Sequence, residues 1–302
     1  MKEITTWVRA ARLRTLPLSV AGIIAGTALA KGMGLSDPIL FGMMLATTVA
    51  YQITSNFAND YGDGVKGTDN DTRIGPQRVL QSGALSASRL KKGIWVSIVV
   101  SLLLTLGTLW RAFGLDSMGY FALFLLLGGL AIWAAIRYTV GSNAYGYRGL
   151  GDLFVFLFFG LLSVMGSLFL YTRQWMPQAL LLAITIGALS TAVLNLNNLR
   201  DSESDRRAGK NTLVVQMGYQ NGIRYHVALC LLAFLSLGGF ILLQPDPLRL
   251  TPALLPFTII GVHLGKVLRT RDPSKLDPEL KKLALSTFFI ALLLYFANDN
   301  FL

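Results

Sequence analysis

Acidic side chains gather in two short stretches of this sequence, and each stretch opens with asparagine. Residues 56–71 read NFANDYGDGVKGTDND, and residues 197–205 read NNLRDSESD. In the second stretch, Asn197, Asp201 and Asp205 recur every fourth residue, so a continuous helix places all three on one face. In the first stretch, Asn59 and Asp63 have the same spacing. Each stretch therefore predicts a helix end that presents a row of oxygen-bearing side chains.

Carboxylates stacked on one helix face repel each other, and a divalent cation offsets that repulsion. Mg²⁺ takes oxygen ligands and keeps waters or substrate phosphates in its shell. Two such clusters at one membrane face can hold a pair of Mg²⁺ ions against a diphosphate. A lone acid such as Glu203 also fits a solvated loop, but two matching clusters do not fit that explanation well. The predicted metal ligands are Asp60, Asp63, Asp69, Asp201 and Asp205.

Helices that cross a membrane must position these clusters. Hydrophobic residues make up 53% of the 302-residue chain and charged residues 14%, against roughly 25% charged residues in soluble domains. A transmembrane helix needs about 20 apolar residues. Nine segments approach or meet this need, namely 16–33, 39–58, 93–110, 117–137, 153–172, 177–196, 225–243, 251–268 and 283–298. We predict an all-α fold, a polytopic membrane helical bundle of about nine transmembrane helices, built as a single domain from residues 1–302.

The basic residues lie between the apolar segments. A net charge of +11 could indicate nucleic-acid binding in a soluble chain, but here the positive-inside rule accounts for it. With the N-terminus in the cytoplasm, 23 of the 27 Lys and Arg residues fall in cytoplasmic segments. The sequence therefore predicts a multi-pass protein in a lipid bilayer, with a cytoplasmic N-terminus and no nucleic-acid partner. Both acidic stretches then face the cytoplasm.

At these residues the sequence resembles the UbiA superfamily of intramembrane prenyltransferases. That superfamily pairs two motifs of the form N-D-x-x-D-x-x-x-D on cytosolic helix ends. The first motif is matched by Asn59, Asp60 and Asp63. Its last position is Gly67 here, and Asp69 is the nearest substitute. The second motif is matched by Asn197, Asp201 and Asp205, with Asn198 in place of its first Asp.

Longer strings are similar to the 1,4-dihydroxy-2-naphthoate polyprenyltransferases of menaquinone synthesis. They are ARLRTLP at 11–17, NDYGDGVKGTD at 59–69, RIGPQR at 73–78, YRGLGD at 147–152 and NNLRD at 197–201. The resemblance implies a UbiA-like bundle with a central cavity that opens towards lipid, in a bacterial cell inner membrane. It also implies Mg²⁺ dependence, with polyprenyl diphosphate and 1,4-dihydroxy-2-naphthoate as substrates. Decarboxylation during the transfer would give demethylmenaquinone.

The resemblance also suggests a role for each candidate residue. The catalytic acids that hold Mg²⁺ would be Asp60, Asp63, Asp201 and Asp205. Asn59 and Asn197 would orient these acids or bind directly. The diphosphate would be met by the nearby cations Lys66, Arg78 and Lys210. Weaker candidates for the aromatic acceptor lie on the third cytoplasmic segment, where an Arg could bind a carboxylate through two hydrogen bonds: Arg137, Tyr138, Tyr147, Arg148 and Asp152.

Two other functions remain as alternatives. The first is a prenyltransferase of the same superfamily that uses another aromatic acceptor, such as 4-hydroxybenzoate. The second is a membrane transporter, whose ion sites lie near the middle of the bilayer. The acids here lie at helix ends, and no charged residue falls in the middle of a predicted span, which disfavours transport. His226 and His263 lie at or in predicted spans, where we expect a structural role.

Overall fold

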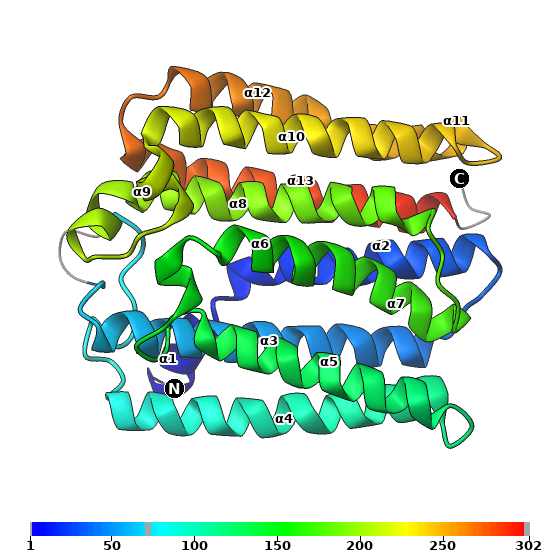
Figure 1. The fold of residues 1–302 in the computed structure, drawn as a ribbon, viewed down its shortest axis with the longest axis horizontal. Helices are drawn as coiled ribbons and strands as arrows, with labels where there is room; N and C mark the ends of the chain where they lie inside the picture. The colour runs from blue at the N-terminus through cyan, green and yellow to red at the C-terminus, as the bar shows by residue number, and fades with distance from the viewer. Residues whose placement is uncertain (1, 70–73, 299–302) are drawn as a thin grey trace.

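The computed structural model of the protein describes residues 2–69 and 74–298, and these residues form a bundle of long helices (Figure 1). Its α-helices are α1 (Lys2–Ala11), α2 (Leu16–Gly32), α3 (Pro38–Val65), α4 (Ala87–Phe113), α5 (Met118–Arg137), α6 (Gly151–Val155), α7 (Ser163–Thr172), α8 (Ala179–Arg207), α9 (Leu213–Met217), α10 (Tyr219–Leu242), α11 (Pro247–Leu250), α12 (Pro256–Arg269) and α13 (Asp277–Ala297). A π-helix, η3 (Phe156–Leu162), joins α6 to α7. Four 3₁₀ turns complete the list: η1 (Leu13–Thr15), η2 (Tyr145–Arg148), η4 (Thr251–Leu254) and η5 (Pro273–Leu276). No β-strand occurs in the described ranges.

The expected membrane bundle of about nine helices is confirmed. Within the described residues, eight helical segments are long and apolar enough to span a membrane. The remaining long helix, α3, has 28 residues but carries a stripe of polar side chains that lowers its hydropathy. Figure 1 shows these helices side by side, with the chain passing back and forth along the long dimension of the molecule.

Two helices continue well beyond the apolar segments that predict them. The predicted spans end at residues 58 and 196, whereas α3 runs to Val65 and α8 to Arg207. Hydropathy measures the length of the apolar segment, and a helix can continue past it into water or into polar protein. Both acidic stretches therefore start on helices, as their four-residue spacing predicts.

The core of the bundle is centred on α8. The side chains of Leu182, Ile186 and Leu189 on this helix have no exposed surface. The π-helix η3 approaches α8 so closely that a Cβ on Gly160 would lie 2.5 Å from the Cα of Gly187. A side chain at Gly160 cannot fit there, so the glycine permits the contact of the two backbones.

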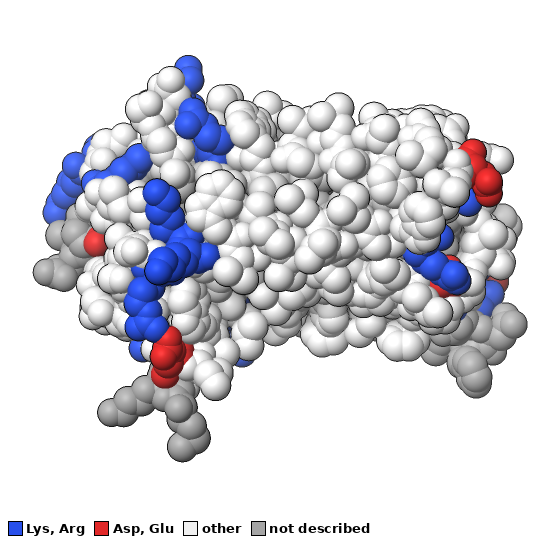
Figure 2. All heavy atoms as spheres, turned by 90° about the horizontal axis from the view of Figure 1, so that it is seen from below, with Lys and Arg blue, Asp and Glu red and all other residues white. Residues whose placement is uncertain are grey.

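The charged residues are concentrated at one end of the bundle. Figure 2 shows Lys and Arg gathered on the end that holds the N-terminus and α9, with few charges along the sides. The α3–α4, α5–α6 and α8–α9 connections all lie at this end (Figure 1). The two acidic stretches are therefore at the same end of the molecule, next to its basic residues.

Candidate active site

The first acidic cluster lies at the end of α3 and is bound by two neighbouring loops. Asp63 Oδ2 is 2.6 Å from Nη1 of Arg78, in the connection between α3 and α4. The same guanidinium nitrogen is 2.9 Å from Oδ2 of Asp69. On its other side, Asp63 accepts a 2.8 Å hydrogen bond from the Tyr147 hydroxyl, which comes from η2. Three segments thus meet at Asp63.

Lys210 connects the first acidic cluster to the second. Its Nζ atom is 4.0 Å from Asp63 Oδ2 and 3.7 Å from Asp205 Oδ1. The loop turns back at Gly209, whose φ of 69° lies in the left-handed region, and the Lys210 amide donates to the backbone oxygen of Asp205. The ends of α3 and α8 therefore converge on one ammonium group, although Asp63 and Asp205 are far apart in the sequence.

Both cations of this centre are buried and remain charged. The side chains of Arg78 and Lys210 are 10% and 8% exposed. Burial alone would lower the pKa of Lys210, but the negative charges of Asp63 and Asp205 outweigh it, so its pKa is raised. In the same way, burial opposes the charge of Arg78, and Asp63 and Asp69 more than compensate, so the pKa of Arg78 is also raised.

Tyr147 serves as a neutral hydrogen-bond donor. Burial and the nearby charge of Asp63 both raise the pKa of its hydroxyl, so it stays protonated and donates to that carboxylate. Its ring lies 3.9 Å beneath the ammonium group of the exposed Lys66. The loop that carries Tyr147 is held to the Lys210 loop, because Asn211 donates its amide hydrogen to the Tyr147 backbone oxygen at 3.2 Å.

Asp60 and Asp201 flank the centre in different environments. Asp60 is 1% exposed; its Oδ2 accepts from the amide of Val79 at 3.3 Å, and its Oδ1 has no hydrogen-bond partner among the described residues. Asp201 instead accepts two hydrogen bonds, at 2.8 and 2.6 Å, from Arg200. Arg200 also contacts Asn197 and reaches Asp277 at the start of α13.

The sequence prediction did not include Arg200 among the site residues. Its side chain is 1% exposed and makes an ion pair with Asp201, so it belongs to the second cluster. A sequence signal was present, since Arg200 stands between Asn197 and Asp201 in a stretch rich in acids. The contact with Asp277 joins residues 77 positions apart, and local spacing cannot reveal it.

The donors at this centre fit a hard divalent cation. They are carboxylate and amide oxygens, the ligands that Mg²⁺ prefers. Two of these oxygens, Asp60 Oδ1 and Asn198 Oδ1, are buried and lack a hydrogen-bond partner within the described parts of the chain. Buried polar atoms are normally paired, so unpaired oxygens beside a carboxylate cluster indicate a place for a ligand.

The structure places the remaining predicted residues at differing distances from this centre. Asn59 accepts a 3.3 Å hydrogen bond from Thr139 and lines the cavity described below, together with the half-buried Tyr138. Asp152 is 5% exposed, at the start of α6. Arg137 is half-buried, whereas Arg148 is exposed, and it is the backbone oxygen of Arg148 that accepts from Gln216. Asp71 and Arg73 lie outside the described residues.

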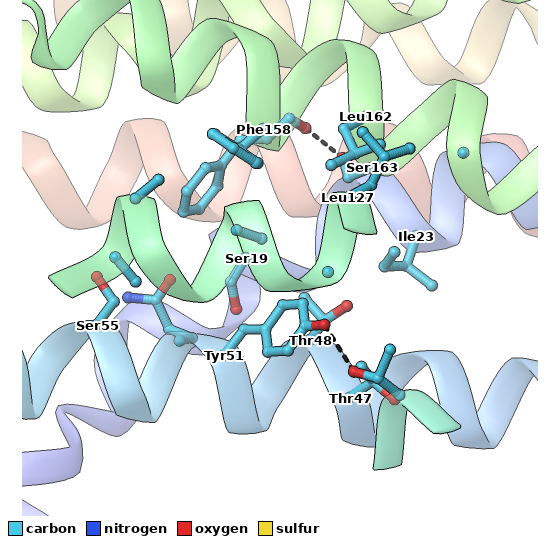
Figure 3. A pocket seen from close by; sticks show the side chains of 18 of the residues that line it. Ser19, Ile23, Thr47, Thr48, Tyr51, Ser55, Leu127, Phe158, Leu162 and Ser163 are labelled. Carbon is cyan, nitrogen blue, oxygen red and sulfur yellow. Dashed lines mark hydrogen bonds between the residues drawn. The ribbon is translucent and has the colours of Figure 1, made fainter. Parts of the chain in front are cut away.

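A cavity of about 350 Å³ lies within the bundle, and its lining includes Asn59, four residues before Asp63 on α3. Asn59 and Tyr138 line it near the acids, and Ile23, Leu109 and Leu170 line it deeper among the helices. Figure 3 shows Ser55, Tyr51 and Thr48 of α3 on one side of the cavity, with Phe158 and Leu162 facing them.

The polar lining of the cavity was not predicted, although the sequence contains its signal. Thr47, Tyr51, Ser55 and Asn59 recur every fourth residue along α3 and all line the cavity. Polar residues at helical spacing in an apolar segment indicate a face turned away from lipid.

Aromatic rings form the opposite wall. The rings of Tyr145 and Phe154 stack with centroids 4.0 Å apart, and Phe158 continues the row at 6.2 Å from Phe154. Tyr138 packs edge-on against Tyr145 at 5.4 Å. Phe158 belongs to the π-helix η3, and such helices occur frequently at functional sites.

The sequence of residues 19–295 matches the model of the UbiA prenyltransferase family. The chain belongs to the UbiA prenyltransferase family. It is 44% identical to the 1,4-dihydroxy-2-naphthoate octaprenyltransferase of Escherichia coli over 276 residues, which cover 91% of this chain and 89% of that protein. It is 40% identical to the enzyme of the same name from Haemophilus influenzae over 295 residues, covering 97% and 95% of the two chains.

Solved structures of distant members share the fold. A UbiA homologue from Aeropyrum pernix superposes with a TM-score of 0.67 at 15% identity, covering 93% of this chain and 99% of that one. A UbiA homologue from Archaeoglobus fulgidus bound to DMAPP and Mg²⁺ superposes with a TM-score of 0.64 at 14% identity, covering 96% and 99%. At such low identity the likeness establishes the fold alone.

Proposed function

We propose that this protein transfers a polyprenyl group from polyprenyl diphosphate to 1,4-dihydroxy-2-naphthoate, with Mg²⁺ as cofactor and demethylmenaquinol, the reduced form of demethylmenaquinone, as product. The observation that carries the proposal is the contact of Lys210 with Asp63 and Asp205, which joins the two acidic clusters one helical turn from Asn59, a residue that lines the cavity. The two bacterial relatives above carry the name of this acceptor and cover nearly the whole chain. Residues 1–302 act as a single domain in this proposal.

The acidic residues hold the reacting diphosphate through metal. Asp60, Asp63, Asp69 and Asp205 would supply ligands around the centre, and Asp201 would join them from the same face of α8. When bound, Mg²⁺ neutralises the negative charge that develops on the departing diphosphate. Asn59 and Asn197 would orient the acids, Asn197 through its contact with Arg200.

The buried cations assist the departure of the diphosphate. Arg78 and Lys210 are charged and lie within the centre, and Lys66 lies beside it above the ring of Tyr147. Because these groups are fixed by surrounding protein, they stabilise developing negative charge with little rearrangement.

The cavity protects the prenyl carbon that the diphosphate leaves. The bond from the allylic carbon to the diphosphate oxygen breaks, and the carbon becomes cation-like. The aromatic wall at Tyr138, Phe154 and Phe158 stabilises such a carbon through ring faces and excludes water from it. The naphthoate ring then forms a bond to this carbon at the position that carries the carboxylate, and CO₂ leaves with the restoration of the aromatic ring.

The acceptor ring would bind between the aromatic wall and the third cytoplasmic segment. Tyr138 lines the cavity. Burial is the largest cause that raises the pKa of its hydroxyl, and the charge of the buried Asp152 raises this pKa further. Arg137 precedes Tyr138 and would bind the carboxylate of the naphthoate. The exposed Arg148 would act only at the entrance.

The acid centre faces the cytoplasm in this proposal. Lys and Arg gather at the end of the bundle that holds the centre (Figure 2), and positive residues favour the cytoplasmic side of a bacterial inner membrane. The N-terminal helix α1 lies at this same end (Figure 1), which gives a cytoplasmic N-terminus.

A defined assay tests the proposed reaction. The purified full-length protein is given labelled polyprenyl diphosphate, Mg²⁺ and either 1,4-dihydroxy-2-naphthoate or 4-hydroxybenzoate. We expect CO₂ and demethylmenaquinol, which air oxidises to demethylmenaquinone for detection, with the naphthoate, and loss of the product when EDTA replaces Mg²⁺. If a prenylated product forms only from 4-hydroxybenzoate, that compound replaces the naphthoate as the proposed acceptor. If neither acceptor is prenylated, the enzyme assignment is excluded in favour of a protein such as a transporter.

A further inference from the structure

Two basic side chains lie between the carboxylates, in positions that a divalent cation would have to share. Arg78 Nη1 is 2.6 Å from Asp63 Oδ2 and 2.9 Å from Asp69 Oδ2. Lys210 Nζ is 4.0 Å from the same oxygen of Asp63 and 3.7 Å from Asp205. A metal ion that binds Asp63 Oδ2 must therefore compete with both side chains.

The two cations lie on loops, whereas most of the acids lie on helices. Asp63 and Asp205 are fixed on the long helices α3 and α8. Arg78 lies in the connection before α4, and Lys210 follows the left-handed Gly209 after the end of α8. A change of side-chain rotamer can move either cation away from the acids without movement of a helix.

We propose that Arg78 and Lys210 are exchangeable counter-ions of this centre. Without metal they neutralise Asp63, Asp69 and Asp205. When Mg²⁺ and the prenyl diphosphate bind, the carboxylates pass to the metal and the two cations pass to the diphosphate oxygens. The charges of Asp63, Asp69 and Asp205 then have partners of opposite sign in both states. The inference rests on the proposed function only for the identity of the diphosphate.

The exchange makes the two ligands depend on each other. Metal alone would leave Arg78 and Lys210 buried beside another cation, and diphosphate alone would bring an anion beside carboxylates that have lost their counter-ions. Bound together, the two ligands avoid both costs, so each must raise the affinity for the other by the same factor. If the two cations served only the diphosphate, their removal would weaken diphosphate binding and leave metal binding unimproved.

The variant Lys210→Met separates these two roles. Mn²⁺ is titrated into the full-length protein without any diphosphate, and free Mn²⁺ is followed by electron paramagnetic resonance. Binding of a non-hydrolysable geranyl thiolodiphosphate is then measured at saturating Mn²⁺. We expect the variant to bind Mn²⁺ alone about tenfold more tightly and the analogue about tenfold more weakly. Lys92→Met is the matched control, because Lys92 is exposed at the start of α4, and it should change neither affinity.

Unchanged or weaker Mn²⁺ binding by a folded Lys210→Met protein would contradict the exchange. The unmodified protein provides a second test that requires no variant. Its affinity for the analogue should be at least about fivefold higher with saturating Mn²⁺ than with EDTA. Equal affinities in the two conditions would overturn the inference.

These measurements contain no acceptor, so they are separate from the test of the proposed reaction. A protein that shows the exchange but does not prenylate dihydroxynaphthoate would exclude that acceptor only. A protein that makes demethylmenaquinone while metal and analogue bind independently would exclude the exchange only.

Discussion

The bundle contains a second buried polar cluster, and it differs from the acid centre in how its groups are paired. His226, His263 and Glu279 come from α10, α12 and α13 and are 0%, 1% and 3% exposed. His263 Nδ1 is 3.0 Å from Glu279 Oε2, and the Nε2 atoms of the two histidines are 2.8 Å apart. Lys282 donates to the other oxygen of Glu279 at 2.6 Å. Both carboxylate oxygens of this cluster therefore have partners.

In the acid centre, by contrast, buried oxygens remain without partners. Asp60 Oδ1 and Asn198 Oδ1 have none within the described residues. Arg78 and Lys210, the cations beside Asp63, also come from loops, whereas the partners in the histidine cluster all come from helices. The histidine cluster also keeps one unpaired atom, since His226 Nδ1 has no hydrogen-bond partner among the described residues. Its carboxylate is nevertheless fully paired between helices, whereas the acid centre has unpaired oxygens and cations on loops, which suit it to accept a metal ion. The pairing of the oxygen atoms, more than burial or charge, separates the two clusters.

The largest expected effect is on catalysis. Asp63→Asn should lower the rate of prenyl transfer at least about 100-fold, because it removes a charge that holds the metal and the diphosphate. Thermal stability should fall only modestly, because Arg78 keeps its contact with Asp69 and Lys210 keeps its contact with Asp205. Rate and melting temperature of the purified variant check this. Asp116→Asn, near the opposite end of the bundle, is the control, and full activity of Asp63→Asn would remove the acid from the mechanism.

The histidine cluster should show the reverse pattern. His263→Ala removes a hydrogen bond from the buried Glu279, and an unsatisfied buried acceptor costs about 2 kcal/mol of unfolding free energy. The specific rate of the folded protein should stay within about threefold of the unmodified value. His263→Gln restores a donor and should recover part of the stability. Loss of activity without loss of stability would mean that this cluster also takes part in the reaction.

A smaller effect is expected at the hydroxyl that orients Asp63. Tyr147→Phe removes a hydrogen bond to a charged acceptor and should lower the rate about tenfold. The ring that supports Lys66 remains, so binding of the diphosphate should change less than the rate. Steady-state kinetics with each substrate varied check this, and Tyr61→Phe on α3 provides a tyrosine control.

The smallest effect is expected within the second acidic stretch itself. Glu203 is exposed and pairs across one helical turn with the exposed Arg207. Such surface pairs contribute little to stability, so Glu203→Gln should leave the rate and the melting temperature equal to those of the unmodified protein within measurement error. A loss of more than tenfold in prenyl transfer would show that acidity of the whole stretch, and not its buried face, governs the site.

The sequence carries enough information for the bundle and for the meeting of its acidic clusters. Apolar length predicts the spans, and the distribution of Lys and Arg predicts that both clusters share one end. The four-residue spacing of Asn59 with Asp63 and of Asp201 with Asp205 predicts helical faces, and α3 and α8 are helical there. These are local properties of the chain, so they can be recognised directly in the linear sequence.

Partners that lie far apart in the sequence could not be predicted in this way. The pairing of His263 with Glu279 and of Arg200 with Asp277 depends on the packing of α13 against α8 and α12. The roles of the glycines after Asp60 also depend on packing. Gly62 lies within α3, where a Cβ would meet Thr139, whereas Gly67 has a positive φ just after the helix.

The pairing of Arg78 with Asp63 has a consequence for the assembly of the protein during synthesis. These two residues are 15 positions apart, whereas Lys210 and Asp205 belong to a part of the chain that is made much later. A nascent chain that has inserted only its first helices can already cover the charge of Asp63 from within its own sequence. The ribosome can therefore make the second half of the protein while Asp63 already has a counter-ion.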